Sequence, residues 1–215
     1  MTVTDSRSWG EGTPPVDDIV AAAIRLVDEQ GFAALTTRRL AMEMGVHRPN
    51  LYRRIESLDQ LLGLMSDSIV AEAGLPDPSI TQWREWLTDC ARRLYTTWRR
   101  HPGSARLIYR GGTHDSTMRL IDRLLEIFLC GGFPEQSVPS VAQAYFAHVF
   151  GSIAAMGAQA EAQPVMERLD PAQQKSYPFL AMGQKLIAQS SEFQAGADFM
   201  VGLDVVLDGI ALRRL

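Results

Sequence analysis

The sequence has few of the residues that stabilise small secreted proteins or mark an exported chain. Among 215 residues there are two cysteines, Cys90 and Cys130, which are too few for a disulfide framework and fit a reducing cytosol. The amino-terminal stretch MTVTDSRSWGEGTPP has no apolar region of the kind that signal peptides contain. We therefore expect a cytoplasmic protein in which residues 1–14 form a flexible arm.

Motifs for catalysis and metal binding are also missing. The chain contains no G-x-S-x-G, Walker loop, H-E-x-x-H or C-x-x-C sequence. His101 and His114 lack the spacing of metal ligands, and the start of a helix explains the paired acids Asp17 and Asp18. The sequence therefore predicts a protein that is not an enzyme and that uses no metal and no cofactor.

The spacing of apolar residues is helical almost throughout, and the alternation typical of strands is scarce, so we predict an all-α fold. Pro15 is expected to be the first residue of a helix, and Thr36 and Ser57 are expected to cap two more. A further short helix should begin near Arg48, after a turn at Gly45. The remaining helices are expected at residues 81–100, 104–110, 115–130, 138–160, 179–189 and 192–214.

Residues 136–160 carry no formal charge, which admits two interpretations. A stretch of this length could span a bilayer. However, it contains Gln143, His148 and Ser152, is rich in Ala and Gly, and has no basic flank. A helix that is apolar nearly all round is also typical of a buried helix in a bundle or a dimer. We predict the buried helix and no association with a membrane.

Positive charge, by contrast, is concentrated in one segment. Residues 36–54, TTRRLAMEMGVHRPNLYRR, contain five arginines and one acid, although the chain as a whole has a net charge of −4. Two short helices joined by a tight turn at Gly45 describe a helix-turn-helix. A solvated basic face on an ordinary helical hairpin is the alternative. Capping, turn and side-chain chemistry all agree with DNA binding, which we therefore predict. The apolar set that would hold the two helices together is Leu40, Met44, Val46, Leu51 and Ile55.

This segment carries a resemblance to a known family. Residues 20–62, VAAAIRLVDEQGFAALTTRRLAMEMGVHRPNLYRRIESLDQLL, closely resemble the N-terminal domain of the TetR family of one-component repressors. More loosely, the W-x-x-W at Trp83 and Trp86, HPG, GGF and GLDVVLDGI resemble the C-terminal domain of its tetracycline-repressor subgroup. The resemblance implies a helix-turn-helix domain at 15–62 and an effector-binding and dimerisation domain at 63–215. It also implies a homodimer that binds a palindromic operator on double-stranded DNA and releases it when a small molecule binds.

The resemblance also assigns DNA contacts to particular residues. Thr37 and Arg38 match the family's contacts at the start of the second helix. Tyr52 is expected to reach a phosphate, and the family's lysine at the start of the fourth helix is replaced by Leu58. Arginine, asparagine and tyrosine side chains are the types that bond phosphates and base edges. The residues that match the recognition-helix contacts are Arg48, Pro49, Asn50, Tyr52, Arg53 and Arg54.

In the C-terminal half this chain departs from the tetracycline repressor. The drug-binding Asn and the magnesium-binding His and acid of that repressor align with Cys90, Ile108 and Ala155. Because all three replacements remove polar ligands, we expect a more apolar or aromatic effector and no magnesium–tetracycline complex. Trp86, Cys90 and Leu94 share one helix face and could wall a pocket, although plain core packing explains each of them as well. The full set of candidate ligand-binding residues is Trp86, Cys90, Leu94, Ile108, Leu124 and Phe146.

The apolar surface of two helices predicts the homodimer. Helices 138–160 and 192–214 both carry more apolar residues than one core face needs, so they could form a symmetric four-helix interface. On the last helix we assign the interface to Phe199, Leu203, Val206, Leu207 and Ile210. Two other functions remain open: a ligand-dependent activator, and an architectural DNA-binding protein without an effector. A shift of the melting temperature by ligand would separate the second from a ligand-responsive regulator.

Overall fold

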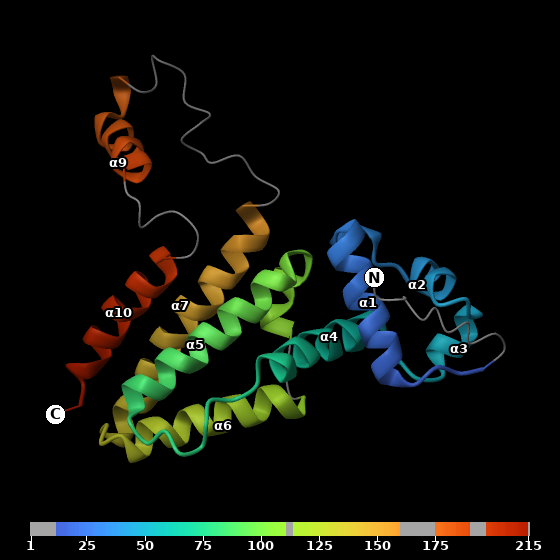
Figure 1. The fold of residues 1–215 in the computed structure, drawn as a ribbon, viewed down its shortest axis with the longest axis horizontal. Helices are drawn as coiled ribbons and strands as arrows, with labels where there is room; N and C mark the ends of the chain where they lie inside the picture. The colour runs from blue at the N-terminus through green and yellow to red at the C-terminus, as the bar shows by residue number, and fades with distance from the viewer. Residues whose placement is uncertain (1–11, 111–113, 160–174, 190–196, 215) are drawn as a thin grey trace, which may run out of the picture.

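The computed structural model describes residues 12–110, 114–159, 175–189 and 197–214, and every regular element in these residues is a helix. The amino-terminal helices gather at one end of the molecule and the carboxy-terminal helices at the other, with α4 (Leu58–Ala73) running between the two groups (Figure 1). This arrangement confirms the predicted all-α fold, with a small amino-terminal part and a larger carboxy-terminal part. Residues 1–11, most of the expected arm, lie outside the described residues.

The amino-terminal part is built from α1, a 3₁₀ turn and three further helices. Pro15 precedes α1 as its N-cap and is not its first residue, so that detail of the prediction was wrong by one position. A glycine with positive φ, Gly45, makes the turn between α2 and α3. The elements are α1 (Val16–Gln30), η1 (Phe32–Ala34), α2 (Thr37–Glu43), α3 (Arg48–Tyr52) and α4 (Leu58–Ala73).

Local hydrogen bonds fix where α2 and α4 begin. The side-chain oxygen of Thr36 accepts a bond of 3.1 Å from the backbone N–H of Arg39, and Ser57 accepts one of the same length from Gln60. Gln60 also reaches back, but its Oε1 accepts from the N–H of Glu56 rather than from the cap residue itself. Both predicted N-caps are therefore confirmed, and Gln60 satisfies one further N–H group just before α4.

The carboxy-terminal part contains the long helices. Two predictions needed correction: residues 102–110 form a 3₁₀ helix, and the last helix occupies 197–211, with 190–196 outside the described residues. A continuous core fills this part and includes the inner faces of α5, α6, α7 and α10. The elements are α5 (Trp83–Arg100), η2 (Pro102–Arg110), α6 (Asp115–Cys130), η3 (Glu135–Ser137), α7 (Val138–Gln159), α9 (Pro178–Gln189) and α10 (Ala197–Ala211).

The uncharged helix α7 packs into this core. Val141, Tyr145, Val149 and Ile153 are buried within the single chain, at four successive turns of one face. Among the described residues, no helix is long and apolar enough to cross a membrane. The buried-helix interpretation of residues 136–160 is therefore the one that the structure supports.

Helix α4 joins the two parts. It packs against α1 on one side and against α5, α6 and η2 on the other, and the expected domain boundary at residue 62 falls inside it. Asp67, in the middle of α4, accepts hydrogen bonds from the backbone N–H groups of Ser116 and Thr117 at 3.3 and 2.7 Å. These N–H groups belong to the first turn of α6, which has no intrahelical partners for them. Asp67 therefore fixes α4 to the start of α6.

Candidate nucleic-acid interface and effector domain

Three fully buried side chains hold α2 and α3 together. Leu40 on α2, Leu51 on α3 and Ile55 just after it have no exposed surface. Because these side chains face inward, the opposite sides of the two short helices face solvent. The predicted helix-turn-helix is thus present, and α3 lies at the outer edge of the molecule (Figure 1).

One hydroxyl links the exposed sides of α2 and α3. The Thr37 Oγ1 accepts hydrogen bonds from Arg48 Nη2 at 3.3 Å and from the Tyr52 hydroxyl at 3.2 Å. Hydrogen bonds with Thr37 and Arg48 lower the pKa of the Tyr52 phenol. Arg48, Pro49, Tyr52 and Arg53 together line a shallow concave surface. Three of the predicted contacts, from two different helices, therefore lie within hydrogen-bonding distance of one another.

Most of the other predicted DNA contacts are also exposed. Arg38, Pro49, Arg53 and Arg54 face solvent, as a contact with a large polyanion requires. Asn50 is different: it is 8% exposed, and its Nδ2 donates a bond of 3.3 Å to the carbonyl of Gly12. The expectation that Asn50 faces outward was wrong, because the segment that precedes α1 covers it. No local pattern within α3 could have shown this.

The six candidate ligand-binding residues come together in the hydrophobic core of the carboxy-terminal part. Five are buried to 5% exposure or less, and Phe146 is partly buried and packs against the same core. None of them lines the concave surfaces found at α3, at the start of α5 or between α7 and α10. Their positions are compatible with core packing and with a buried ligand site alike.

Two polar groups near these residues differ in hydrogen bonding: the Tyr145 hydroxyl has partners and the Trp86 indole has none among the described residues. Tyr145, whose hydroxyl donates to the carbonyl of Leu87 at 2.9 Å, also bonds the thiol of Cys90. Burial raises the pKa of Cys90 to about 12, so the thiol stays protonated and unreactive. The indole Nε1 of Trp86, in contrast, is buried and has no hydrogen-bond partner among the described residues. An unsatisfied buried donor costs about 1–3 kcal/mol, so Trp86 is a suitable donor for a ligand atom.

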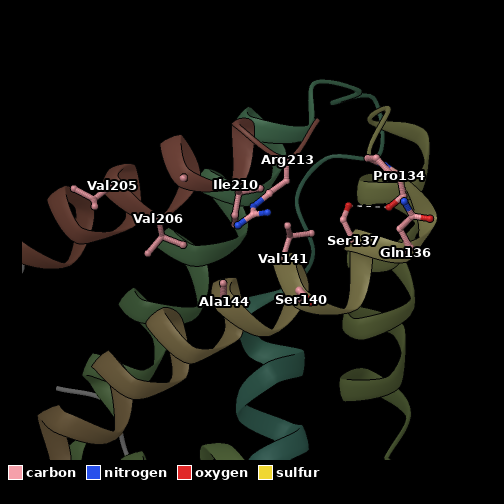
Figure 2. Close-up of a pocket in the computed structure, with 11 residues that line it drawn as sticks. Pro134, Gln136, Ser137, Ser140, Val141, Ala144, Val205, Val206, Ile210 and Arg213 are labelled. Atoms are coloured by element: carbon pink, nitrogen blue, oxygen red, sulfur yellow. Dashed lines mark hydrogen bonds between the residues drawn. The ribbon is translucent and has the colours of Figure 1, made fainter. Parts of the chain in front are cut away.

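A groove of about 760 Å³ lies between α7 and α10 on the surface of the chain (Figure 2). Apolar side chains from both helices line it, and Arg213 lies over its end near Val141. In Figure 2, Val205 and Val206 project from α10 along the groove. The residues that line it are Pro134, Gln136, Ser137, Ser140, Val141, Ala144, Val205, Val206, Gly209, Ile210 and Arg213.

The structure corrects the prediction of which α10 residues lie at the dimer interface. Phe199, Leu203, Leu207 and Ile210 are at most 3% exposed within the single chain, so they belong to its own core, and of these four only Ile210 also lines the groove. The outer side of α10 carries Val201 and Val205, at 48% and 67% exposure. Sequence spacing gives the two faces of a helix but not which one the rest of the chain covers.

Helix α9 also exposes apolar side chains. It stands away from the body of the molecule in Figure 1. Phe179 is 86% exposed, and Met182 and Leu186, one and two turns further, are more than half exposed. Two helices, α9 and α10, therefore present apolar surface that the single chain leaves uncovered.

Comparisons with known proteins agree with this geometry. The family model "Bacterial regulatory proteins, tetR family" matches residues 19–65, and "Tetracyclin repressor-like, C-terminal domain" matches residues 75–214. The chain is 29% identical over 203 residues to the tetracycline repressor protein class A from transposon 1721 of Escherichia coli, covering 92% of this chain and 90% of that protein. It is 35% identical over 91 residues to the HTH-type transcriptional repressor DrrR1 of Streptomyces coeruleorubidus, a match that spans 42% of this chain and 34% of that protein.

Solved structures show the same fold. Apo ActR from Streptomyces coelicolor superposes with a TM-score of 0.77 at 22% identity, over 95% of this chain and 98% of that chain. ActR in complex with actinorhodin superposes with a TM-score of 0.73 at 23% identity, over 92% of this chain and 95% of that chain. An exposed helix-turn-helix joined to an all-helical second domain defines a DNA-binding transcriptional regulator. The chain belongs to the TetR family.

Proposed function

We propose that this chain is a cytoplasmic homodimeric repressor that binds a palindromic operator and leaves it when a small apolar or aromatic ligand binds its carboxy-terminal domain. The observation that carries the proposal is the exposed cluster of Thr37, Arg48 and Tyr52 on a helix-turn-helix that is joined by α4 to a large helical core. The proposed DNA contacts are Thr37, Arg38, Arg48, Pro49, Asn50, Tyr52, Arg53 and Arg54.

The chemistry of the cluster suits a phosphate backbone and a base edge. A phenol with a lowered pKa is a stronger hydrogen-bond donor, and Tyr52 projects beside two arginines whose charge attracts phosphate. Arg48 is the best candidate for a bidentate contact with guanine, since the arginine fork matches the two acceptors of that base. Asn50 takes part if its side-chain amide leaves the Gly12 carbonyl when DNA binds. The amide would then turn toward the major groove of the DNA.

The groove between α7 and α10 supports the homodimer. A two-fold interface uses the same patch twice, and a groove flanked by the apolar residues Val205 and Val206 suits a second copy of α7 and α10. Outside their own helix turns, Gly151 and Gly209 have no atom of the described residues within 4 Å of where a Cβ would lie, so both leave room for a partner helix. Two recognition helices could then engage two half-sites.

The ligand is proposed to enter the core around Trp86, Cys90, Leu94, Ile108, Leu124 and Phe146. Four of these side chains are aliphatic or aromatic and carry no hydrogen-bonding group, so they favour an apolar or aromatic ligand. Trp86 would supply the donor that orients such a ligand. Ligand-dependent release of the operator then obeys linkage: the ligand weakens operator binding by the same factor by which the operator weakens ligand binding.

Selection of bound duplexes from random DNA, followed by a salt titration, tests the DNA-binding part of the proposal. We expect an inverted repeat to be selected, and log K to fall with log[salt] at a slope of about −4 or steeper for the dimer. A flat response between low and moderate salt would remove the basis for the DNA contacts. Native mass spectrometry of the purified protein identifies a co-purified ligand, which should then release the selected duplex.

Activation by ligand is the second candidate function, because the same fold can couple a ligand to tighter DNA binding. In-vitro transcription from a promoter that carries the selected sequence distinguishes the two. A repressor lowers transcription below the protein-free level without ligand and restores it with ligand. A ligand-dependent activator leaves transcription at the protein-free level without ligand and raises it above that level with ligand.

A further inference from the structure

A polar cluster at the junction of the two domains is centred on His101, the residue that follows α5. Its Nδ1 lies 2.6 Å from Oδ2 of Asp28 on α1, and its Nε2 lies 3.1 Å from Oε2 of Glu72 on α4. His101 therefore connects the effector domain directly to the first helix of the DNA-binding domain. This connection is separate from the continuous chain of α4.

The backbone around His101 is held in place. Its N–H donates to the carbonyl of Trp98 at 2.9 Å, and its own carbonyl accepts from Ser104 at 3.0 Å. Two residues later, a Cβ on Gly103 would lie 2.6 Å from the carbonyl oxygen of Val27, so η2 packs directly on the backbone of α1. The imidazole is thus presented to Asp28 by a close contact between backbones, and it has little freedom to turn away.

The surroundings of the ring are acidic on two sides. The His101 side chain is 15% exposed, against 22% for Asp28 and 42% for Glu72. Burial raises the pKa of Asp28, an effect that the contact with His101 opposes and that the charges of Glu72 and Glu29 increase. On the far side of Glu72, Arg100 Nη2 lies 2.9 Å from its other oxygen, so Glu72 is held between two basic groups.

The hydrogen bonds of an imidazole ring that has a carboxylate at each nitrogen depend on whether the ring is protonated. The imidazolium carries two N–H groups and can donate to both carboxylates, whereas the neutral ring carries one N–H and one lone pair. With both nitrogens already within 3.1 Å of a carboxylate oxygen, the neutral ring directs its lone pair at one of them. That contact is repulsive, so one of the two connections is lost when the ring loses its proton.

We infer that His101 is a positioning residue that holds α1 against the effector domain through Asp28 and Glu72 while its imidazole is protonated, and that deprotonation loosens the DNA-binding domain. The inference rests on the proposed function in one respect, namely that operator binding is one of its readouts. Two recognition helices must meet two half-sites at a fixed spacing, so freedom of each DNA-binding domain lowers the affinity of the dimer. Operator affinity should therefore fall when the ring loses its proton.

Fluorescence anisotropy with the selected operator, at pH 6 and pH 8 and constant ionic strength, measures this effect. His101→Gln keeps a hydrogen-bonding side chain without a titratable proton, and His114→Gln removes a histidine at the start of α6 as a matched control. We expect wild-type affinity to fall about three- to tenfold more than that of His101→Gln between the two pH values, the size of one partly exposed charge-assisted hydrogen bond. His114→Gln should follow the wild type. Equal pH profiles for wild type and His101→Gln would overturn the inference.

Hydrogen exchange gives a readout that needs no DNA. After correction for the intrinsic rate, the amides of α1 should exchange faster at pH 8 than at pH 6 in the wild type, and equally at both in His101→Gln. Should His101→Gln fail to fold, Asp28→Asn keeps the shape of the partner, removes its charge and should reduce both pH responses. If exchange in α1 responds to pH through His101 but no duplex is selected from random DNA, the proposed function is wrong and the role of His101 in holding α1 still stands. If His101→Gln changes the pH response of hydrogen exchange in α1 but not that of operator affinity, the positioning role of His101 is overturned.

Discussion

Replacing Val205 by glutamate should break the proposed dimer and leave the subunit folded. Val205 is 67% exposed on the outer side of α10 and lines the groove between α7 and α10 (Figure 2). In a single chain the glutamate would project into water, so the fold should keep its stability to within about 0.5 kcal/mol. In a two-fold dimer two carboxylates would enter the apolar interface together, in place of two valines.

The size of the effect follows from the two losses at each Val205. Burying a valine contributes about 1.5–3 kcal/mol when it starts fully exposed, and two thirds of that is at stake for a side chain that is 67% exposed. Leaving a buried charge unpaired costs about 3–5 kcal/mol more. Counted once for each subunit, the loss exceeds about 8 kcal/mol, and every 1.4 kcal/mol is tenfold in the dissociation constant. A wild-type dimer of about nanomolar affinity would therefore be replaced by a variant that is monomeric at micromolar concentration.

Sedimentation velocity and thermal unfolding, measured on the same samples, separate the interface from the core. Val205→Glu should sediment as a monomer. The matched control is Leu203→Ala, which removes a side chain with no exposed surface and should cost about 2–5 kcal/mol of stability within the subunit. Gly209→Leu gives a second test of the interface, because a Cβ there meets no atom of the described residues within 4 Å outside its own helix turn.

The reasoning fails if Val205→Glu and Gly209→Leu both sediment as dimers at the wild-type concentration. The uncovered face of α10 would then lie outside any interface, and the groove would need another occupant. A Val205→Glu protein that is unfolded at room temperature would equally refute the assignment, since it would show that this face of α10 is part of the subunit core.

Further predictions concern DNA binding, the ligand site and acid stability. Arg48→Ala should relax sequence preference, at a cost of about 1–3 kcal/mol per half-site in competition assays, whereas Tyr52→Phe should weaken all duplexes alike. Cys90→Trp fills the core and should lower ligand affinity in calorimetry while unliganded DNA binding persists; equal ligand affinity would place the site elsewhere. Burial alone would raise the pKa of Asp67, but hydrogen bonds from Thr117 and Ser116 lower it below 3.8, so its stabilising effect is present above that value and is lost as pH falls through the lower, folded-state pKa. Melting curves should show that Asp67→Asn destabilises the protein near pH 7 and that the difference shrinks toward pH 3.

The sequence by itself determined the local structure and, with it, the family. Thr36 and Ser57 cap helices because their hydroxyls bond N–H groups three residues ahead, an interaction that needs no other part of the chain. Gly45 turns the chain because its positive φ is open to glycine. The apolar spacing of α2 and α3 then requires Leu40 and Leu51 to face inward, which leaves the arginines outside.

Only the tertiary structure decided which faces are covered. Asn50 is polar and was expected in solvent, but Gly12, 38 residues away, covers it. Leu203 and Val205 are both apolar residues of α10. Because α7 and α5 pack against one side of that helix, Leu203 is buried in the core and Val205 is left uncovered. His101 bonds Asp28 across 73 residues. Burial and long-range hydrogen bonds depend on where distant segments meet, and that meeting is a property of the whole fold rather than of any local pattern.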